Sequence, residues 1–383
     1  TTGDDNVGIG LFALSTNTTA NENTAVGAYS ISANTTGTKN TAIGKGSLQT
    51  NTTASCNTAV GEKALWKNTT GADNVAMGYV ALTANTTGAN NVAIGVTTLD
   101  SNTEGDNNTA VGRSALGNST TGDNNTAVGL YSLLANTTGT NNTAVGCEAL
   151  KTNTTGTHNV ALGNVPLCAN TTGVHNIGVG NLALRINTTG DCNVAMGIGA
   201  LDANTTADSN VAIGPYSMSA ASTGHSNTAI GGSSGNNVTT GDNNVLLGYS
   251  AGTDGVRTVN SGDNNIVIGN NSSATAHIKI DWTVTSDERD KMNFEEVPHG
   301  LDFVNQMKPV SFVFKKSRED ATPHGPQKYG FKAQDILALE GDNNVIISND
   351  DEENLKVTNS YLFPVLVKAI QELKAEIDEL KKK

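Results

Sequence analysis

Residues 142–159 read NTAVGCEALKTNTTGTHN, and this stretch contains the whole unit that decides the fold. The glycine of the unit recurs every 17 residues without a slip, and an asparagine stands four positions before it each time. The series comprises Gly10, Gly27, Gly44, Gly61, Gly78, Gly95, Gly112, Gly129, Gly146, Gly163, Gly180, Gly197, Gly214, Gly231 and Gly248, and Gly269 follows after 21 residues. A fixed period this short predicts a solenoid in which each coil packs only on its neighbours.

Each unit divides into a short strand and turns. The Thr-Ala-Val run has the small and β-branched side chains of a packed strand, whereas Asn-Thr-Thr-Gly is turn chemistry. We expect the asparagines to stack into a ladder and the glycine to adopt positive φ. A second apolar anchor follows each glycine by four residues: Leu14, Ile31, Leu48, Leu65, Leu82, Leu99, Leu116, Leu133, Leu150, Leu167, Leu184, Leu201 and Met218. Two anchors per coil make a thin core, so the sequence predicts a mostly β, 17-residue-repeat parallel β-solenoid stalk that associates as a homotrimer.

The repeat core, N-[TV]-A-[VIM]-G with a following Ala-Leu or Ser-Leu, resembles the head repeat of trimeric autotransporter adhesins, although the adhesin period is usually shorter. The resemblance covers about residues 1–250 and implies a parallel β-roll in which three chains lie side by side. Arrays of this period are also similar to those in fibre proteins of tailed phages. Gly235 and Gly252 replace the second anchor, so the roll is expected to loosen over 232–276, and 251–285 is predicted to be a transition.

Several features could indicate glycosylation, ice binding, disulfides or a metal site, but a structural role is favoured for each. The Asn-Thr-Thr triplets are formally glycosylation sequons, but a turn role under repeat constraint is favoured. Threonines in turns also argue against a flat ice-binding face. The repeat phases of Cys56, Cys147, Cys168 and Cys192 forbid disulfides between them, so buried free thiols are expected. His158 and His175 share a phase on adjacent coils and are expected to stack; a metal site there lacks further ligands, so neither a metal nor another cofactor is predicted.

The chain joins two regions of different composition. Residues 1–285 hold 9 Lys/Arg and 17 Asp/Glu, whereas the much shorter 286–383 holds 14 and 19. The net charge of −13 argues against a protein that tracks nucleic-acid phosphates. No apolar run reaches the length of a membrane span. The chain opens on Thr1-Thr2-Gly3 in the middle of a unit, so we expect it to be the C-terminal piece of a longer polypeptide.

The C-terminal region has the pattern of a small α+β domain. The alternating segment HIKIDWTV (277–284) predicts a strand, 300–307 a short helix, 309–314 a strand, and Pro323 and Pro326 a loop. A further strand is expected at 344–348, followed by an acidic turn at 349–354. A final helix is predicted over 361–383, because its apolar residues step 3, 4, 3, 4, 3 as in a coiled-coil seam: Phe363, Leu366, Ile370, Leu373, Ile377 and Leu380.

Four ordered motifs lie in this region: SDERDK (286–291), GLDFVNQMKPVSF (300–312), YGFKAQD (329–335) and LVKAIQEL (366–373). Together they resemble the C-terminal intramolecular chaperone domain of phage tail spikes and fibres, of the endosialidase type, over residues 282–383. The resemblance implies a domain that trimerises a β-structured stalk and then cuts the chain before the serine. The scissile bond is then Thr285–Ser286.

The chemistry of such a cut is coherent with these residues. A serine hydroxyl needs a base to become a nucleophile, and Lys291 can serve Ser286 if desolvation keeps its amine neutral. Asp287 and Arg289 match the family motif and are expected to position the turn. Asp290 departs from the family pattern, and a carboxylate there would tend to keep Lys291 protonated. The alternative is a non-cleaving chaperone in which Ser286 is a helix N-cap.

The prediction is therefore a structural fibre of a tailed phage with stalk 1–250, transition 251–285 and chaperone–autoprotease 286–383. It acts at most once on itself. It would be made in the host cytoplasm and located in the virion. Its expected partners are two further copies, virion proteins attached through a missing N-terminal part and a host-surface receptor, without nucleic acid or membrane. The alternative is a bacterial trimeric surface adhesin with a non-cleaving trimerisation domain. A turnover glycosidase is disfavoured, because acids such as Asp100, Glu104 and Asp106 lie at irregular phases.

Overall fold

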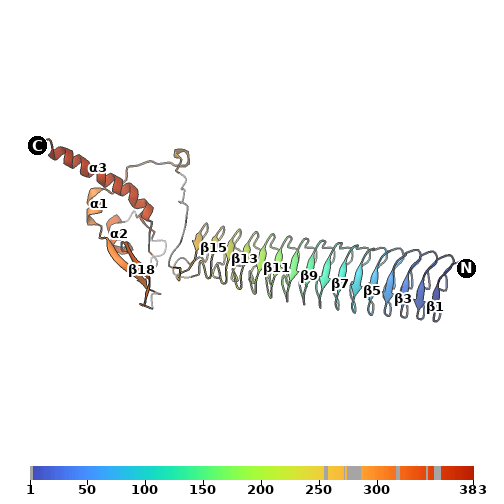
Figure 1. Cartoon of the computed structure of the whole chain (residues 1–383). Helices are drawn as coiled ribbons and strands as arrows, with labels where there is room; N and C mark the ends of the chain where they lie inside the picture. The colour runs from blue at the N-terminus through green and yellow to red at the C-terminus, as the bar shows by residue number, and fades with distance from the viewer. Residues whose placement is uncertain are drawn as a thin grey trace. The chain divides into compact units, whose positions relative to one another are not determined.

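The computed structural model describes residues 3–253, 258–270, 272–273, 286–315, 320–341, 344–348 and 355–383, with the side chain of Asp290 excepted. The chain forms two compact units, Thr1–Asn270 and Asn271–Lys383 (Figure 1). Each unit is built from its own part of the sequence pattern.

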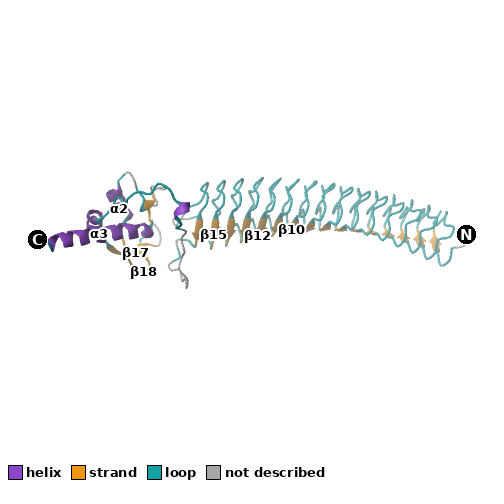
Figure 2. Ribbon diagram, turned by 90° about the horizontal axis from the view of Figure 1, so that it is seen from above, coloured by secondary structure: helices purple, strands orange, loops and turns teal. Residues whose placement is uncertain are grey.

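The first unit is one parallel sheet whose strands follow the chain in order, β1 to β16, each hydrogen-bonded to the next. Neighbouring strands pair in register at the repeat period, as Thr126 with Thr143. Figure 2 shows these strands, in orange, following one another along the unit. The strands are β1 Val7–Ile9, β2 Thr24–Val26, β3 Thr41–Ile43, β4 Thr58–Val60, β5 Val75–Met77, β6 Val92–Ile94, β7 Thr109–Val111, β8 Thr126–Val128, β9 Thr143–Val145, β10 Val160–Leu162, β11 Ile177–Val179, β12 Val194–Met196, β13 Val211–Ile213, β14 Thr228–Ile230, β15 Val245–Leu247 and β16 Ile266–Ile268. The predicted β-solenoid is confirmed.

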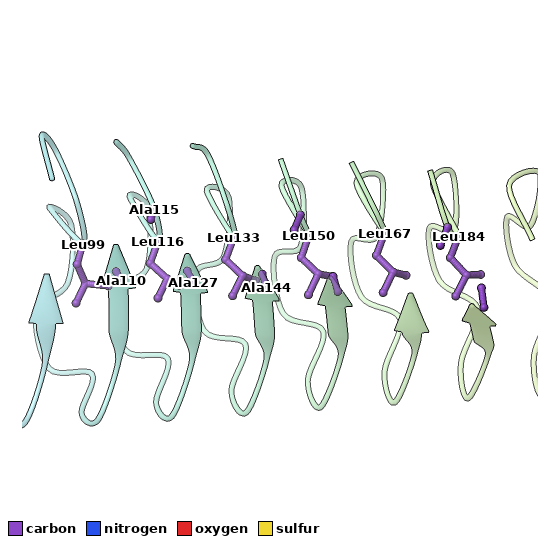
Figure 3. Close-up of a cluster of buried hydrophobic side chains, with 14 of the residues drawn as sticks. Leu99, Ala110, Ala115, Leu116, Ala127, Leu133, Ala144, Leu150, Leu167 and Leu184 are labelled. Atoms are coloured by element: carbon purple, nitrogen blue, oxygen red, sulfur yellow. The ribbon is translucent and has the colours of Figure 1, made fainter. Parts of the chain in front are cut away.

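The core of this unit is a double column of small and large side chains. The middle residue of nearly every strand is an alanine, fully buried as in Ala127, and the leucine six residues later, such as Leu133, is fully buried beside it. Figure 3 shows the leucines stacked from coil to coil, with the strand alanines next to them. Both predicted anchors are confirmed.

Stacked asparagines close the turns. Asn125 accepts the Asn142 backbone N–H on its Oδ1 at 3.0 Å, and its amide donates to the Gly139 carbonyl at 2.9 Å. A second ladder runs through the Asn-Thr-Thr triplets, where the Asn153 amide donates to Asn136 Oδ1 at 2.9 Å. The predicted ladder is therefore confirmed and is double. The triplet asparagines are buried along most of the stalk, so the sequons are turn residues.

The repeat glycine has the predicted positive φ, for example +129° at Gly231, where a Cβ would lie 2.5 Å from the Gly248 carbonyl oxygen. The leucine anchors also have positive φ, for example 49° at Leu133, which the sequence did not indicate. This left-handed conformation is uncommon for a residue other than glycine. It turns the chain sharply while the leucine remains inside.

The solenoid continues past residue 250, because β16 pairs in parallel with β15. The expected loosening at Gly235 and Gly252 is wrong, and the stalk boundary at 250 lies before the last strand. The strand residue Leu246 replaces the usual alanine and fills the space that the glycines leave. Its Cδ1 would lie 2.6 Å from a Cβ on Gly235, and its Cδ2 2.9 Å from one on Gly252.

The cysteines do not form disulfides, and two of the histidines stack on each other. The four cysteines are free, as predicted, but Cys56 and Cys192 are exposed rather than buried, because their positive-φ turn position faces solvent. Burial raises the pKa of the Cys168 thiol. His158 and His175 stack at 4.9 Å between ring centroids, as predicted. Within the described ranges, no group of three or more His, Cys, Asp or Glu side chains could hold a metal ion.

The second unit combines helices with two small antiparallel sheets. Its elements are the 3-10 helix η1 Glu288–Asp290, α1 Leu301–Gln306, β17 Val310–Lys315, β18 Pro323–Gly330, α2 Ala333–Glu340, β19 Ile347–Ser348, β20 Lys356–Val357, the 3-10 helix η2 Asn359–Tyr361 and α3 Leu362–Leu380. The predicted helices at 300–307 and 361–383 and the strand at 309–314 are confirmed. The strand expected at 344–348 is shorter, and the segments 277–284 and 349–354 lie outside the described residues.

The loop predicted at Pro323 and Pro326 is wrong, because both prolines lie in β18. Among the described residues this strand pairs with β17 alone, in a two-stranded sheet with an irregular register between Phe312 and Phe314. An edge strand tolerates proline, since its open side requires no N–H donor.

Candidate functional site

The candidate site lies in the tight turn at residues 286–291, at the start of the described stretch 286–315. Asp287 is the N-cap of η1, and its Oδ1 accepts the Arg289 backbone N–H at 2.9 Å. The Arg289 guanidinium also donates to both carboxylate oxygens, at 3.0 and 2.6 Å. These side-chain bonds, and then the backbone bond, lower the pKa of Asp287, while the carboxylate raises the pKa of Arg289. The turn is therefore clamped by an ion pair on its own surface.

This clamp brings the predicted serine and lysine together. The Lys291 backbone N–H closes the turn on the Glu288 carbonyl at 3.1 Å. Its Nζ lies 2.6 Å from Ser286 Oγ and 3.5 Å from the Ser286 carbonyl oxygen. The N-cap role that the non-cleaving alternative gives to Ser286 is wrong, since Asp287 is the cap. Ser286 Oγ is therefore directed to the amine, as a Ser–Lys pair requires.

Two members of the predicted site cannot be placed. Thr285, on the other side of the expected scissile bond, lies outside the described residues, and the same holds for the side chain of Asp290. Ser286 and Lys291 are both exposed in the single chain. The geometry therefore supplies a nucleophile and a nearby amine, and their roles in cleavage stay a prediction.

The long helix α3 has two faces with different surroundings. Leu362, Val365 and Ala369 are buried against the unit's own core. The predicted seam stays in solvent in the single chain, with exposures from 39 to 68%: Phe363, Leu366, Ile370, Leu373, Ile377 and Leu380. A shallow groove lined by Val297, Pro364 and Val367, among others, adjoins it. The helix thus completes one core and leaves a second apolar face that the described residues do not cover.

Two charged residues of α3 have contacts that the heptad pattern did not reveal. Glu372 accepts the Leu301 backbone N–H at 2.6 Å and so caps α1. Lys368 donates to the Val297 carbonyl at 2.6 Å. Gly300 makes room for the cap, because a Cβ there would lie 2.2 Å from the Glu372 carboxylate. In the sequence, the one sign of this capping contact is the glycine immediately before the short helix.

Glu340, at the end of α2, is a buried carboxylate with its own set of donors. It accepts backbone N–H groups from Val345, Ile346 and Ile347 at 2.6 to 2.9 Å. A buried carboxylate is tolerated when backbone donors satisfy its oxygens. This contact joins α2 to β19 within the core of the second unit.

Residues 286–345 match the family model described as chaperone of endosialidase. The match begins at Ser286 and covers the turn, α1, β17, β18 and α2. A search of curated proteins found no match. In the described part of the chain, no helix is long and apolar enough to cross a bilayer.

The C-terminal unit thus contains a chaperone domain of the endosialidase type. A solenoid of 17-residue repeats followed by such a domain fits a phage tail fibre that carries its own folding device.

Proposed function

We propose that this chain is a host-attachment or other appendage fibre of a tailed phage, located in the virion. Three copies assemble, the C-terminal domain sets their register, and the domain then cuts itself off at Thr285–Ser286. Further virion proteins and a host-surface receptor are its other partners. The matched chaperone family and the Lys291 Nζ to Ser286 Oγ distance of 2.6 Å support this proposal, and the distance carries its catalytic part.

The uncovered seam of α3 supports assembly as a homotrimer. Six apolar side chains at heptad spacing remain in solvent while the other face of the helix is already packed. Such a seam gains stability when equivalent helices associate through it. A coiled coil of fewer than three full heptads is only marginally stable alone, so other contacts in the domain must also stabilise the trimer.

The proposed cleavage is a single-turnover reaction within the turn. Lys291 takes the hydroxyl proton of Ser286, and Oγ attacks the carbonyl carbon of Thr285. The C–N bond breaks and the nitrogen receives the proton, which leaves an ester between the two parts. Water then hydrolyses the ester, so one peptide bond and one water give a new carboxylate and a new amino terminus.

Assembly and cleavage are coupled through water. In the single chain the side chains of Ser286 and Lys291 are both exposed to water. A neighbouring copy that covers the turn would dry the site and favour the neutral base. The single chain would then stay whole until the trimer forms.

The test is denaturing electrophoresis with intact mass on freshly expressed wild type, Ser286→Ala and Lys291→Met. We expect wild type to yield fragments of residues 1–285 and 286–383, and both variants to stay whole. Lys308→Met is the matched control, since Lys308 is another exposed lysine of the domain, and it should cleave like wild type. If all four proteins stay whole while forming trimers, the domain is a permanent trimerisation cap and the proposed cleavage is wrong.

A further inference from the structure

Each solenoid strand has one outward position on each side of its middle residue, and that middle residue is buried in every strand except β1. The third position is aliphatic or methionine in every strand: Ile9, Val26, Ile43, Val60, Met77, Ile94, Val111, Val128, Val145, Leu162, Val179, Met196, Ile213, Ile230, Leu247 and Ile268. These side chains are not part of the coil's own core. Met77 and Met196 are each 42% exposed, and Ile94 is 38% exposed. We name this column, with the first strand positions beside it, the strand face.

The turn position directly after the repeat glycine shows which residues the coil accepts at another outward position. It is also outward, and Val96, Ile198 and Tyr249 there are 46, 49 and 70% exposed. Its residues nevertheless vary from coil to coil in charge, polarity and size: Leu11, Ala28, Lys45, Glu62, Tyr79, Val96, Arg113, Leu130, Cys147, Asn164, Asn181, Ile198, Pro215, Gly232, Tyr249 and Asn270. The coil therefore accepts polar residues at an outward position. The uniform third strand position needs another cause.

Strand propensity does not supply that cause. Threonine is as favourable in strands as valine, and the first strand position is threonine in seven strands: Thr24, Thr41, Thr58, Thr109, Thr126, Thr143 and Thr228. The third position never takes it. The difference between two outward positions of one strand points to a dry contact at the third position. A continuous apolar stripe whose residues are all exposed or half-buried also marks an interaction surface.

The periodicity of the stripe selects its partner. The stripe contains one apolar side chain from each of the sixteen strands. A matching surface must therefore present apolar groups at the same spacing and over the same length. A second copy of this chain does so. The strand face is also uncharged, which lets identical chains with a net charge of −13 approach without like charges in contact.

We propose that the strand face is the surface through which the stalks of the assembled copies contact one another, with the third strand positions at the centre. This inference rests on the homotrimer proposed above and assigns its stalk interface. The turn positions after the glycines then remain in solvent.

Two methionines of the wild-type chain report on this face without any substitution. The assembled protein is treated with hydrogen peroxide, and sulfoxide formation at Met77 and Met196 is followed by peptide mass. We expect both to oxidise on the order of tenfold slower than in the guanidinium-unfolded chain, near the rate of the fully buried Met218, because oxidation follows exposure. If the protein is trimeric by light scattering but both methionines oxidise near the unfolded rate, the inference is wrong and the homotrimer stands. If the protein is monomeric, the homotrimer itself is wrong.

A matched pair of double variants tests the same face by charge. Ile94→Lys/Met196→Lys places lysines on the strand face, and Val96→Lys/Ile198→Lys places them two residues away on the same two coils. We expect the first to lose its stalk contacts, seen as oxidation of Met77 at the unfolded rate, while its far-UV spectrum keeps the solenoid signature. The second should protect Met77 like wild type. Equal protection in both variants, or loss only in the second, would overturn the assignment.

Discussion

At the scale of single residues, the stalk depends on an amide that both donates and accepts. The second asparagine ladder passes through Asn85, Asn102 and then position 119, where the residue is serine. The described structure leaves Asn102 Oδ1 and Ser119 Oγ buried without a hydrogen-bond partner. The ladder breaks again at Ala221, one coil after Asn204, whose Oδ1 is also unpaired. At both breaks a missing amide leaves the preceding asparagine oxygen buried without a donor.

Ser119→Asn should repair this break and stabilise the stalk. The new amide would donate to Asn102 Oδ1, as the Asn153 amide does to Asn136. Satisfying a buried acceptor is worth about 1–2 kcal/mol. The measurement is the unfolding rate in guanidinium, which should fall. Ser119→Ala is the control, because it removes the hydroxyl without supplying a donor, and a variant with asparagine that unfolds as fast as the one with alanine would contradict the argument.

The repeat glycine sets a second requirement at this scale. Gly231→Ala should destabilise the stalk by at least about 1–3 kcal/mol, the usual cost of strained backbone, since φ is +129° and the new Cβ would meet the next coil's carbonyl oxygen at 2.5 Å. Gly232→Ala, one residue later, adds a Cβ at ordinary contact distance, 3.5 Å from Tyr249. Thermal unfolding of the two variants should therefore differ clearly. Equal losses would show that the repeat glycine is not conformationally required.

At the scale of elements, α3 separates folding of the domain from its association. Its buried residues hold α1 and the core, and Glu372 adds the cap on α1, whereas the seam side chains remain 39 to 68% exposed. Charge on the seam should thus cost association before it costs the fold of the domain. Charge on the opposite face would do the reverse.

Ile370→Asp should therefore abolish trimers and, with them, self-cleavage. Ile370 is 66% exposed in the single chain, so its replacement removes little from the domain's own core. Gln371→Asp carries the same new charge one residue away, outside the seam, and should assemble and cleave like wild type. Light scattering and denaturing electrophoresis of the full-length proteins distinguish the outcomes. A trimeric Ile370→Asp protein would show that association does not use this seam.

The sequence predicted elements where a local period repeats and missed contacts that depend on residues far apart. Strand spacing, the leucine column and α3 follow from periods of 17 and of 3.5 residues. The packing of Leu246 against Gly235 and Gly252 could not be predicted, because the large side chain belongs to one part of the coil and the missing anchors to another. The contact of Glu372 with Leu301 spans 71 residues and has no periodic signal. Ser286 and Lys291 were identified from their motif, but only the structure shows that Asp287 forms the cap that brings them together.

At the scale of the whole molecule, the proposed cut makes folding a one-way process. The solenoid strands pair in order along the chain, so wrong registers differ from the correct one by a whole repeat and look almost equally good locally. A domain of different composition can fix the register once and then be removed. The remaining stalk would then persist because of its own barrier to unfolding, since it could not refold once unfolded without the domain that nucleated assembly.

This separation predicts a difference between unfolding and refolding. The cleaved stalk, residues 1–285, and the uncut Ser286→Ala protein should unfold in guanidinium at rates within about threefold of each other, since stalk contacts that form after the folding transition state govern unfolding. After dilution of the denaturant, the Ser286→Ala protein should regain its trimer mass and far-UV spectrum. The separated stalk should not, because its copies have lost the domain that registers them. Equal recovery of both would show that the repeats carry their own register information and that the chaperone role of residues 286–383 lies elsewhere.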